Sequence, residues 1–242
     1  MNYLSNDTDW FIKQFRTGEP FAFSRWGDGE WRSVLLAEYG KLPKGQNHFR
    51  NCDGHQFFPA MNQRLCRILK RSPAYLLGFQ PFAWRLYKTE IRRFVRKHLP
   101  DQEWCRANVF AAACVDGRFG EILAAMKQQP IMFVGPNYLR GIHKHVPVAQ
   151  FVEVPLENCF RQLQRIIDES AKKAEKLPKG SIISITASMP ANIVVDRLYR
   201  RLGDRYFIID FGSVYDPFVG KNTRSQHRSC PVAKNLAALK SS

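Results

Sequence analysis

Short apolar runs that alternate with longer amphipathic stretches constrain the fold of this chain more than any other feature. Runs such as Ile131–Val134 and Ile182–Ile185 have the length of strands and are far too short to cross a bilayer. Strands that are apolar throughout bury both of their faces, and strands separated by helices usually pair in parallel. The sequence therefore predicts a Rossmann-like α/β fold with a mostly parallel sheet and helices on both faces.

No repeat or linker divides the chain, so we expect a single domain over residues 1–242. The predicted strands are 21–24, 75–79, 109–114, 131–134, 151–154, 181–186 and 206–210, and the predicted helices are 30–39, 60–71, 85–99, 119–127, 158–177 and 191–202. Residues 58–107 are predicted to form a basic helical insertion. Residues 219–242 are predicted to form a basic tail, and we expect its last ten residues to be mobile.

The net charge of +16 comes from 37 Lys and Arg against 21 Asp and Glu. Most of the excess lies in two blocks: residues 58–107 carry eleven basic and three acidic side chains, and residues 197–242 carry nine and three. Such a field attracts polyanions such as nucleic acid, an anionic membrane surface or phosphorylated substrates. The alternative is that the surplus only keeps the surface soluble.

Six cysteines lack any paired spacing, which favours buried, reduced thiols in a cytoplasmic protein. The N-terminal ten residues are polar and acidic, unlike a secretory signal. We therefore expect a cytoplasmic protein with no integral membrane segment.

The segment Ser24–Trp31 places a Gly-bracketed acid between a predicted strand and a predicted helix. Ligands of open α/β sheets bind at the carboxyl ends of the strands, where this turn would lie. Asp28 and Glu30 could there hold Mg²⁺ or Mn²⁺ together with substrate phosphates, and the glycines would let the backbone approach the ligand. The motif alone is equally typical of a helix start, with Asp28 as the N-cap and Glu30 at the positive end of the helix dipole.

The run Phe23–Glu30 resembles the N-terminal signature of the GT-D-type glycosyltransferases, a bacterial and viral family with a Rossmann-like fold. Further segments resemble the family in the same order: 133–136, 154–160, 190–202 and 207–213. The likeness covers about residues 20–220. It implies a metal-dependent enzyme of the cytoplasm of a bacterium or a virus-infected host cell, with a nucleotide sugar, by analogy a UDP-sugar, as donor.

The resemblance also implies roles for single residues. Asp28 and Glu30 would bind Mn²⁺ or Mg²⁺ and the diphosphate of the donor. Donor contacts are expected from Arg25, Trp26, Gly27, Gly29, Gly135, Pro136, Ser188, Asp210 and Gly212. Trp26 could stack on a uracil or a sugar. Ser188 stands where the family tends to carry a Gly-Pro.

A second set of polar residues, 216–228, follows the last predicted strand and would leave the same edge of the sheet. Lys221, Arg224 and His227 could neutralise the charge of a departing nucleoside diphosphate. Asp216 is a candidate catalytic base by position, as is Asp210. A solvated basic tail is the alternative explanation for this segment.

The basic blocks suggest a polyanionic acceptor, and we favour DNA with a hydroxylated base, which would have to leave the duplex to react. A cell-surface glycan or glycoprotein is the main alternative, and helix 85–99 could also dock on a membrane surface. A non-catalytic nucleic-acid-binding protein is a separate hypothesis. The sugar, the stereochemistry and the oligomeric state are left open.

Overall fold

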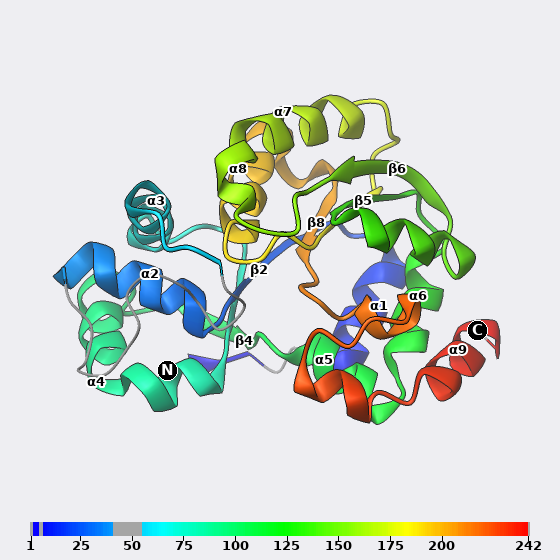
Figure 1. The fold of residues 1–242 in the computed structure, drawn as a ribbon, viewed down its shortest axis with the longest axis horizontal. Coiled ribbons are helices and arrows are strands. Elements are labelled where there is room, and N and C mark those ends of the chain that lie inside the picture. The colour runs from blue at the N-terminus through cyan, green and yellow to red at the C-terminus, as the bar shows by residue number, and fades with distance from the viewer. Residues whose placement is uncertain (1, 5–6, 41–54, 242) are drawn as a thin grey trace.

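The strands form one parallel sheet. The computed structural model describes residues 2–4, 7–40 and 55–241. In this part, eight strands follow the order β1-β4-β3-β2-β8-β7-β5-β6, and all neighbouring pairs are parallel (Figure 1). They are β1 (Asn2–Tyr3), β2 (Ala22–Trp26), β3 (Leu76–Phe79), β4 (Glu103–Arg106), β5 (Ile131–Gly135), β6 (Val148–Glu153), β7 (Ile182–Ile185) and β8 (Phe207–Asp210). The predicted fold class is confirmed.

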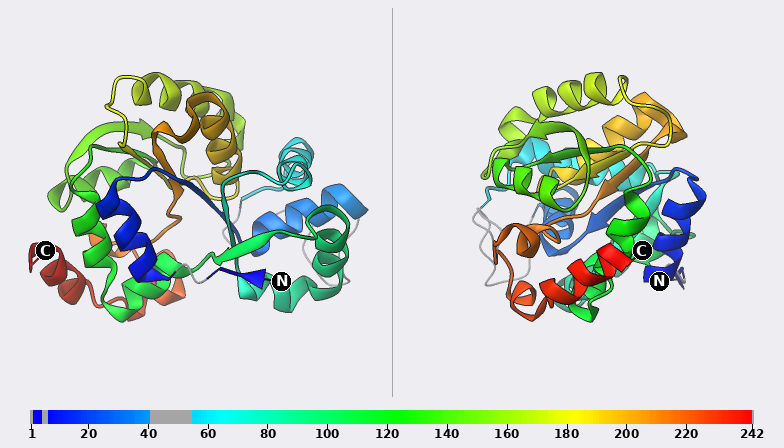
Figure 2. Two further views of the ribbon diagram at one scale, coloured as in Figure 1. Left: turned by 180° about the vertical axis from the view of Figure 1, so that it is seen from behind. Right: turned by 90° about the vertical axis from the view of Figure 1, so that its right-hand side faces the viewer.

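Each face of the sheet has its own apolar core, because successive residues of a strand point to opposite faces. In β5, Ile131 and Phe133 join one core, whereas Met132 and Val134 join the other. Helices α1 (Thr8–Thr17), α5 (Val109–Asp116), α6 (Phe119–Met126) and α9 (Val232–Ser241) cover the first face, and α2 (Asp28–Tyr39), α3 (Pro59–Lys70), α4 (Pro81–His98), α7 (Leu163–Ala174) and α8 (Ala191–Leu202) cover the second (Figures 1 and 2).

Strand β2 lies where the two halves of the sheet meet. On one side it pairs with β3, the next strand in the chain, and on the other with β8, the last strand. From β4 the chain crosses to β5 and then returns towards β2 through β7 and β8. This arrangement creates a topological switch point, and ligands of open α/β sheets bind in the crevice at the carboxyl ends of such strands.

Two predictions about the elements are wrong. Residues 109–114 lie in helix α5 and do not form a strand. Three consecutive alanines favour a helix, and the apolar run is too short for the spacing of its residues to distinguish a helix from a strand. Residues 58–107 are not a helical insertion, because they supply strands β3 and β4 of the sheet in addition to α3 and α4.

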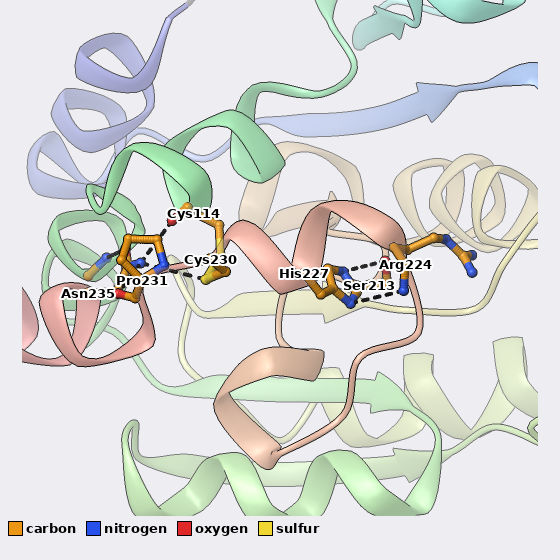
Figure 3. Close-up of a disulfide and its surroundings, with 8 residues drawn as sticks. Cys114, Ser213, Arg224, His227, Cys230, Pro231 and Asn235 are labelled. Carbon is orange, nitrogen blue, oxygen red and sulfur yellow. Dashed lines mark hydrogen bonds between the residues drawn. A yellow bond between two sulfur atoms is a disulfide. The ribbon is translucent and has the colours of Figure 1, made fainter.

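The C-terminal segment is ordered against the rest of the molecule, contrary to the predicted mobile tail. Helix α9 packs on α6, and the side chain of Asn235 donates to the carbonyls of Cys114 and Pro231 and accepts from the amide of Gly120 (Figure 3). A β-carbon on Gly120 would lie 1.8 Å from the Asn235 carbonyl oxygen, so this close approach requires glycine.

A disulfide between Cys114 and Cys230 joins α5 to the start of this segment, with 5.6 Å between the two α-carbons (Figure 3). The prediction that all cysteines are reduced is therefore wrong for this pair. Cys66, Cys105 and Cys159 are free and buried, as predicted, and Cys52 lies outside the described residues. Within the described ranges, no helix is long and apolar enough to cross a membrane.

Candidate functional site

The segment that carries Asp28 and Glu30 forms the junction of β2 and α2. Strand β2 ends at Trp26, Gly27 is the N-cap, and α2 begins at Asp28. The Gly27 amide donates to Oε2 of Glu30 over 2.9 Å; Glu30 thus makes its half of a capping box, and Gly27 has no side chain to make the other half. Both acidic side chains are half-buried. The helix-start interpretation is thus correct for Glu30, and it fixes the carboxylate at the carboxyl edge of the sheet.

Three carboxylates gather at this edge. The pKa of Glu30 is raised to about 7; burial is the largest cause, the charges of Asp210 and Asp28 add to it, and a backbone hydrogen bond and the charge of Arg25 oppose it. Asp210 is the last residue of β8 and is almost fully buried. Charges act on one another strongly only at short range in a protein, so Asp210 and Asp28 lie near Glu30. The ends of strands β2 and β8 bring these groups together.

Arg25 connects the acidic group to the neighbouring loops. Its Nε donates to the Ala107 carbonyl over 2.8 Å, and its own carbonyl accepts from the Asn192 side chain over 2.9 Å. Burial raises the pKa of Asp210, and the positive charge of Arg25 opposes this rise. The Gly212 amide also donates to Oδ1 of Asp210 over 2.9 Å.

This set of charges suits a divalent cation. Asp28, Glu30 and Asp210 together carry three negative charges when ionised, and Arg25 supplies one positive charge. Burial is the main cause of the raised pKa of Glu30, and the charges of Asp210 and Asp28 add to the rise. Mg²⁺ and Mn²⁺ accept one or two carboxylates and complete their shell with phosphate and water. No group of three or more His, Cys, Asp or Glu in the described part could hold a metal, so substrate oxygens would have to supply further ligands.

A cavity of about 450 Å³ opens beyond the ends of strands β5 to β8. Most of its lining comes from the residues that follow each strand: Pro136 and Tyr138 after β5, Val154 to Leu156 and Cys159 after β6, Thr186 to Ser188 after β7, and Gly212, Ser213, Asp216, Thr223 and Arg224 after β8. His55, from the segment before α3, completes the lining. The Thr186 hydroxyl donates to the Gly212 carbonyl over 2.8 Å and ties two of these loops together. The volume is typical of a small-molecule site.

Five of the predicted site residues line this cavity: Pro136, Ser188, Gly212, Asp216 and Arg224. Ser188 has a φ of +50°, a left-handed conformation that favours glycine. Gly135 ends β5 just beneath the lining, and a β-carbon there would lie 3.0 Å from Leu139. Lys221 is exposed and does not line the cavity, so the structure does not bring it to the site.

Asp216 lies at the boundary between cavity and core, in the 3₁₀ helix η4 (Asp216–Val219). Its Oδ1 accepts from the Tyr138 hydroxyl over 3.0 Å, and its Oδ2 accepts from the Thr223 hydroxyl. Burial raises its pKa, and the hydrogen bonds from Thr223 and Tyr138 oppose the rise. With both oxygens engaged, Asp216 orients Tyr138 and the loop of Arg224; its role as a catalytic base stays a prediction.

Two predicted donor contacts are contradicted by burial. Trp26 is fully buried, and its indole Nε1 donates to the Ser24 hydroxyl over 2.9 Å, so it is a core residue that cannot stack on a ligand. His227 is 5% exposed, with Nε2 3.3 Å from the Ser213 hydroxyl and Nδ1 accepting from the Arg224 amide (Figure 3). Burial and the charge of Arg224 lower its pKa, so His227 is a poor source of positive charge.

Several residues near the site were not predicted. Tyr138, Thr186 and Ser213 line the cavity, and Gln80 approaches the metal turn so closely that a β-carbon on Gly27 would lie 2.6 Å from its Oε1. All four follow a strand by one to three residues. Scanning the first polar residue beyond every predicted strand would have found Gln80 and Ser213, whereas Thr186 lay inside the predicted strand 181–186 and Asn137 precedes Tyr138.

The comparisons with known proteins support the fold. No protein-family model matches the chain, and no curated protein matches it. One solved structure, described as the highly conserved domain of unknown function 1792 with a distinct glycosyltransferase fold, is similar with a TM-score of 0.60. The sequences are 15% identical, and the match covers 90% of this chain and 80% of that one. The chain therefore has a glycosyltransferase-like fold, and at this identity the likeness speaks for the fold alone.

Proposed function

We propose that the protein is a metal-dependent glycosyltransferase that moves a sugar from a nucleotide-sugar donor to a hydroxyl group. One observation carries the proposal: Asp28, Glu30 and Asp210 converge at the switch point of a glycosyltransferase-like fold, beside a cavity of about 450 Å³. The acidic cluster lies next to a cavity beyond the ends of four strands. Such a site suits a metal-bound diphosphate with an attached nucleoside.

Asp28 and Glu30 are the residues that would hold Mn²⁺ or Mg²⁺. When bound, such a cation would balance the negative charge of the donor diphosphate and of the leaving nucleoside diphosphate. Arg25 would keep Asp210 ionised and in position at the end of β8. This division of roles agrees with the GT-D resemblance of residues 23–30.

The nucleoside part of the donor would lie in the cavity. Arg224 lines it and supplies a guanidinium that can bind a phosphate through two parallel hydrogen bonds. In Figure 3 the Arg224 side chain points away from the ring of His227, whose contact with the Arg224 amide holds the backbone in place. A UDP-sugar is the donor that the resemblance favours.

The charge of the surface favours a polyanionic acceptor, and we propose DNA with a hydroxylated base. Part of this basic excess lines three grooves formed by helices α3, α4, α7 and α8, through Arg64, Arg67, Arg71, Lys88, Arg92, Arg93, Arg96, Lys97, Arg197, Arg200 and Arg201. Of these, Arg71, Lys97, Arg200 and Arg201 also pair with acidic side chains. DNA binding through such groups should weaken with salt, with a log–log slope of about −0.9 for each phosphate contacted.

A donor screen read by mass spectrometry tests the activity. The protein with Mn²⁺ is incubated with nucleotide sugars and with hydroxymethylated DNA, plain DNA or a glycan. We expect the DNA mass to increase by one sugar only for the hydroxylated bases, and we expect Asp28→Asn to abolish the product. Asp9→Asn, which changes an exposed acid in the first turn of α1, is the matched control.

The same screen separates the alternatives. Transfer to the glycan and not to DNA would reassign the acceptor. Salt-sensitive DNA binding without any donor binding or turnover would instead identify a non-catalytic nucleic-acid-binding protein.

A further inference from the structure

Arg32 is a buried cation that has no ion-pair or hydrogen-bond partner for its side chain among the described residues. It lies on α2, one turn after Asp28 and therefore on the same side of the helix. Only 8% of the residue is exposed; its Nε and Nη2 are sealed from solvent and donate no hydrogen bond. Several residues in the described ranges have a buried side-chain nitrogen or oxygen atom without a hydrogen-bond partner, and among them Arg32 is the one that carries a charge. It takes part in none of the ion pairs found there.

Aromatic side chains from two other segments surround this guanidinium. Its central carbon lies 4.9 Å from the centre of the Phe57 ring. Tyr87 lies at a kink in α4, with a non-helical φ of −134° and ψ of 32°. Burial raises the pKa of the Tyr87 phenol, the charge of Arg32 lowers it and the charge of Asp28 raises it. The charges of Arg32 and Asp28 therefore lie close enough to Tyr87 to act on its phenol.

The cation–π contact with Phe57 does not by itself account for the burial of Arg32. Arg93 makes a similar contact, 5.2 Å from the Tyr39 ring, and stays exposed so that water can hydrate its charge. Arg32 has lost most of this hydration, which is costly for a guanidinium. The planar fork of a guanidinium matches the oxygens of a phosphate or a carboxylate, and an anion would satisfy the unused donors.

We propose that Arg32 forms an anion subsite on the acceptor side of the site, where it binds a phosphate or carboxylate group of the acceptor. This inference rests on the proposed function. The donor cavity is built on strands β5 to β8, and Arg32 does not line it. Phe57 comes from the segment before α3, and Tyr87 comes from α4, on the side of β2 that carries β3; His55 of the first segment also lines the donor cavity. Asp28 follows β2, the strand between β3 and β8, where the donor sugar would meet the acceptor.

Anion binding without metal is the direct test. Thermal unfolding and arginine Nε–H NMR spectra are recorded in EDTA with inorganic phosphate or glucuronate, against sodium chloride at equal ionic strength. The Arg32 resonance, assigned by its loss in Arg32→Lys, should shift in a saturable way with at least one anion. Arg32→Gln should lower the affinity for that anion by about tenfold or more, the typical effect of losing a charge-assisted hydrogen bond. Arg16→Gln, which changes an exposed arginine in the last turn of α1 on the opposite face of the sheet, is the matched control and should leave the affinity unchanged.

The two anions distinguish the source of the charge. A preference for phosphate points to a phosphorylated acceptor such as DNA, and a preference for glucuronate points to an acidic glycan. An Arg32 resonance that responds to neither anion overturns the proposal. So does an unfolding temperature of Arg32→Met several degrees below that of the unmodified protein, because Arg32 would then be a structural residue.

Binding of UDP with Mg²⁺ separates this proposal from the proposed function. Arg32→Gln should keep the UDP affinity of the unmodified protein within about twofold. An equal loss of UDP affinity would place Arg32 on the donor and overturn the acceptor assignment. If UDP binds to neither protein while phosphate still requires Arg32, the proposed donor fails and the anion subsite stands.

Discussion

The guanidinium of Arg25 lies directly against the α-carbon of Gly212. A β-carbon on residue 212 would lie 1.7 Å from Nη1 of Arg25, and Gly212 has a φ of +59°, which other residues adopt at a cost. The turn after β8 therefore requires glycine for two reasons. It allows Arg25 of β2 to approach Asp210, and this contact joins the two strand ends that form the acidic cluster.

Gly212→Ala should impair donor binding more than it impairs folding. The added methyl group displaces the flexible end of Arg25 and leaves Asp210 without its cation. Gly180→Ala is the matched control, because Gly180 has a φ of +83° and nothing within 4 Å of the new β-carbon. Both variants should lose about 1–2 kcal/mol from the left-handed conformation, which lowers the unfolding temperature by a few degrees. Calorimetric titration with UDP and Mn²⁺ should show weaker binding for Gly212→Ala alone; equal affinities would contradict the role of Arg25.

Metal binding should depend on pH through Glu30. The folded-state pKa of about 7 exceeds the ordinary value of 4.5, so at pH 6 the carboxyl is mostly protonated and competes poorly for a cation. Stabilisation of the protein by Mn²⁺ should therefore increase from pH 5.5 to pH 8. In Glu30→Gln this increase should be much smaller. Thermal unfolding at several pH values measures both, and an identical pH profile for the two proteins would contradict the assignment.

The same shift has a consequence for stability without metal. Because the pKa of Glu30 is raised on folding, its contribution is fully present below pH 4.5 and is lost as the pH rises through about 7. In EDTA, the unfolding temperature of Glu30→Gln should therefore rise relative to that of the unmodified protein as the pH increases over this interval. The amide oxygen of the introduced glutamine can still accept the hydrogen bond from the Gly27 amide, so the slope of the curve is the quantity to compare.

The disulfide should stabilise the C-terminal segment. Cys114 and Cys230 are 116 residues apart, and closing a loop of that length stabilises a protein by about 2–5 kcal/mol. A reductant should lower the unfolding temperature of the unmodified protein to that of the double variant Cys114→Ala/Cys230→Ala, and it should leave the double variant unchanged. A reductant that has no effect on the unmodified protein would show that the bond does not form in solution.

Trp26→Phe should destabilise the protein without changing its affinity for UDP. Trp26 is fully buried and packs 6.5 Å from Trp31, so the smaller ring leaves a cavity that costs about 1–3 kcal/mol. Urea unfolding measures the stability, and titration with UDP and Mn²⁺ measures the affinity. A large loss of affinity in a folded variant would restore the stacking role predicted from the sequence.

The sequence was sufficient to predict six of the eight described strands, because strands such as β5 are apolar on both faces, whereas β1 and β4 were not predicted. It failed for residues 109–114, where alanine and short apolar side chains suit a helix and a strand alike. It also placed Trp26 beside the ligand, since proximity along the chain to Asp28 does not reveal that alternate residues of β2 point into the core.

The acidic cluster was predicted in part. Asp28 and Glu30 are close in sequence, so a local motif reveals them. Asp210 joins them because β8 pairs with β2, and Arg32 is distinguished by burial that depends on Phe57 and α4. Such contacts between distant segments follow from the topology, and no local pattern encodes them.

Titration of UDP into the protein with Mn²⁺, and again with EDTA, tests the central claim most directly. If Asp28 and Glu30 hold a cation that binds the donor diphosphate, UDP should bind only with Mn²⁺. Asp28→Asn should weaken this binding by about 100-fold or more, since even indirect supports of metal sites contribute 10- to 100-fold. Asp9→Asn should bind as the unmodified protein does. Equal UDP affinity in EDTA and in Mn²⁺, retained by Asp28→Asn, would contradict the account.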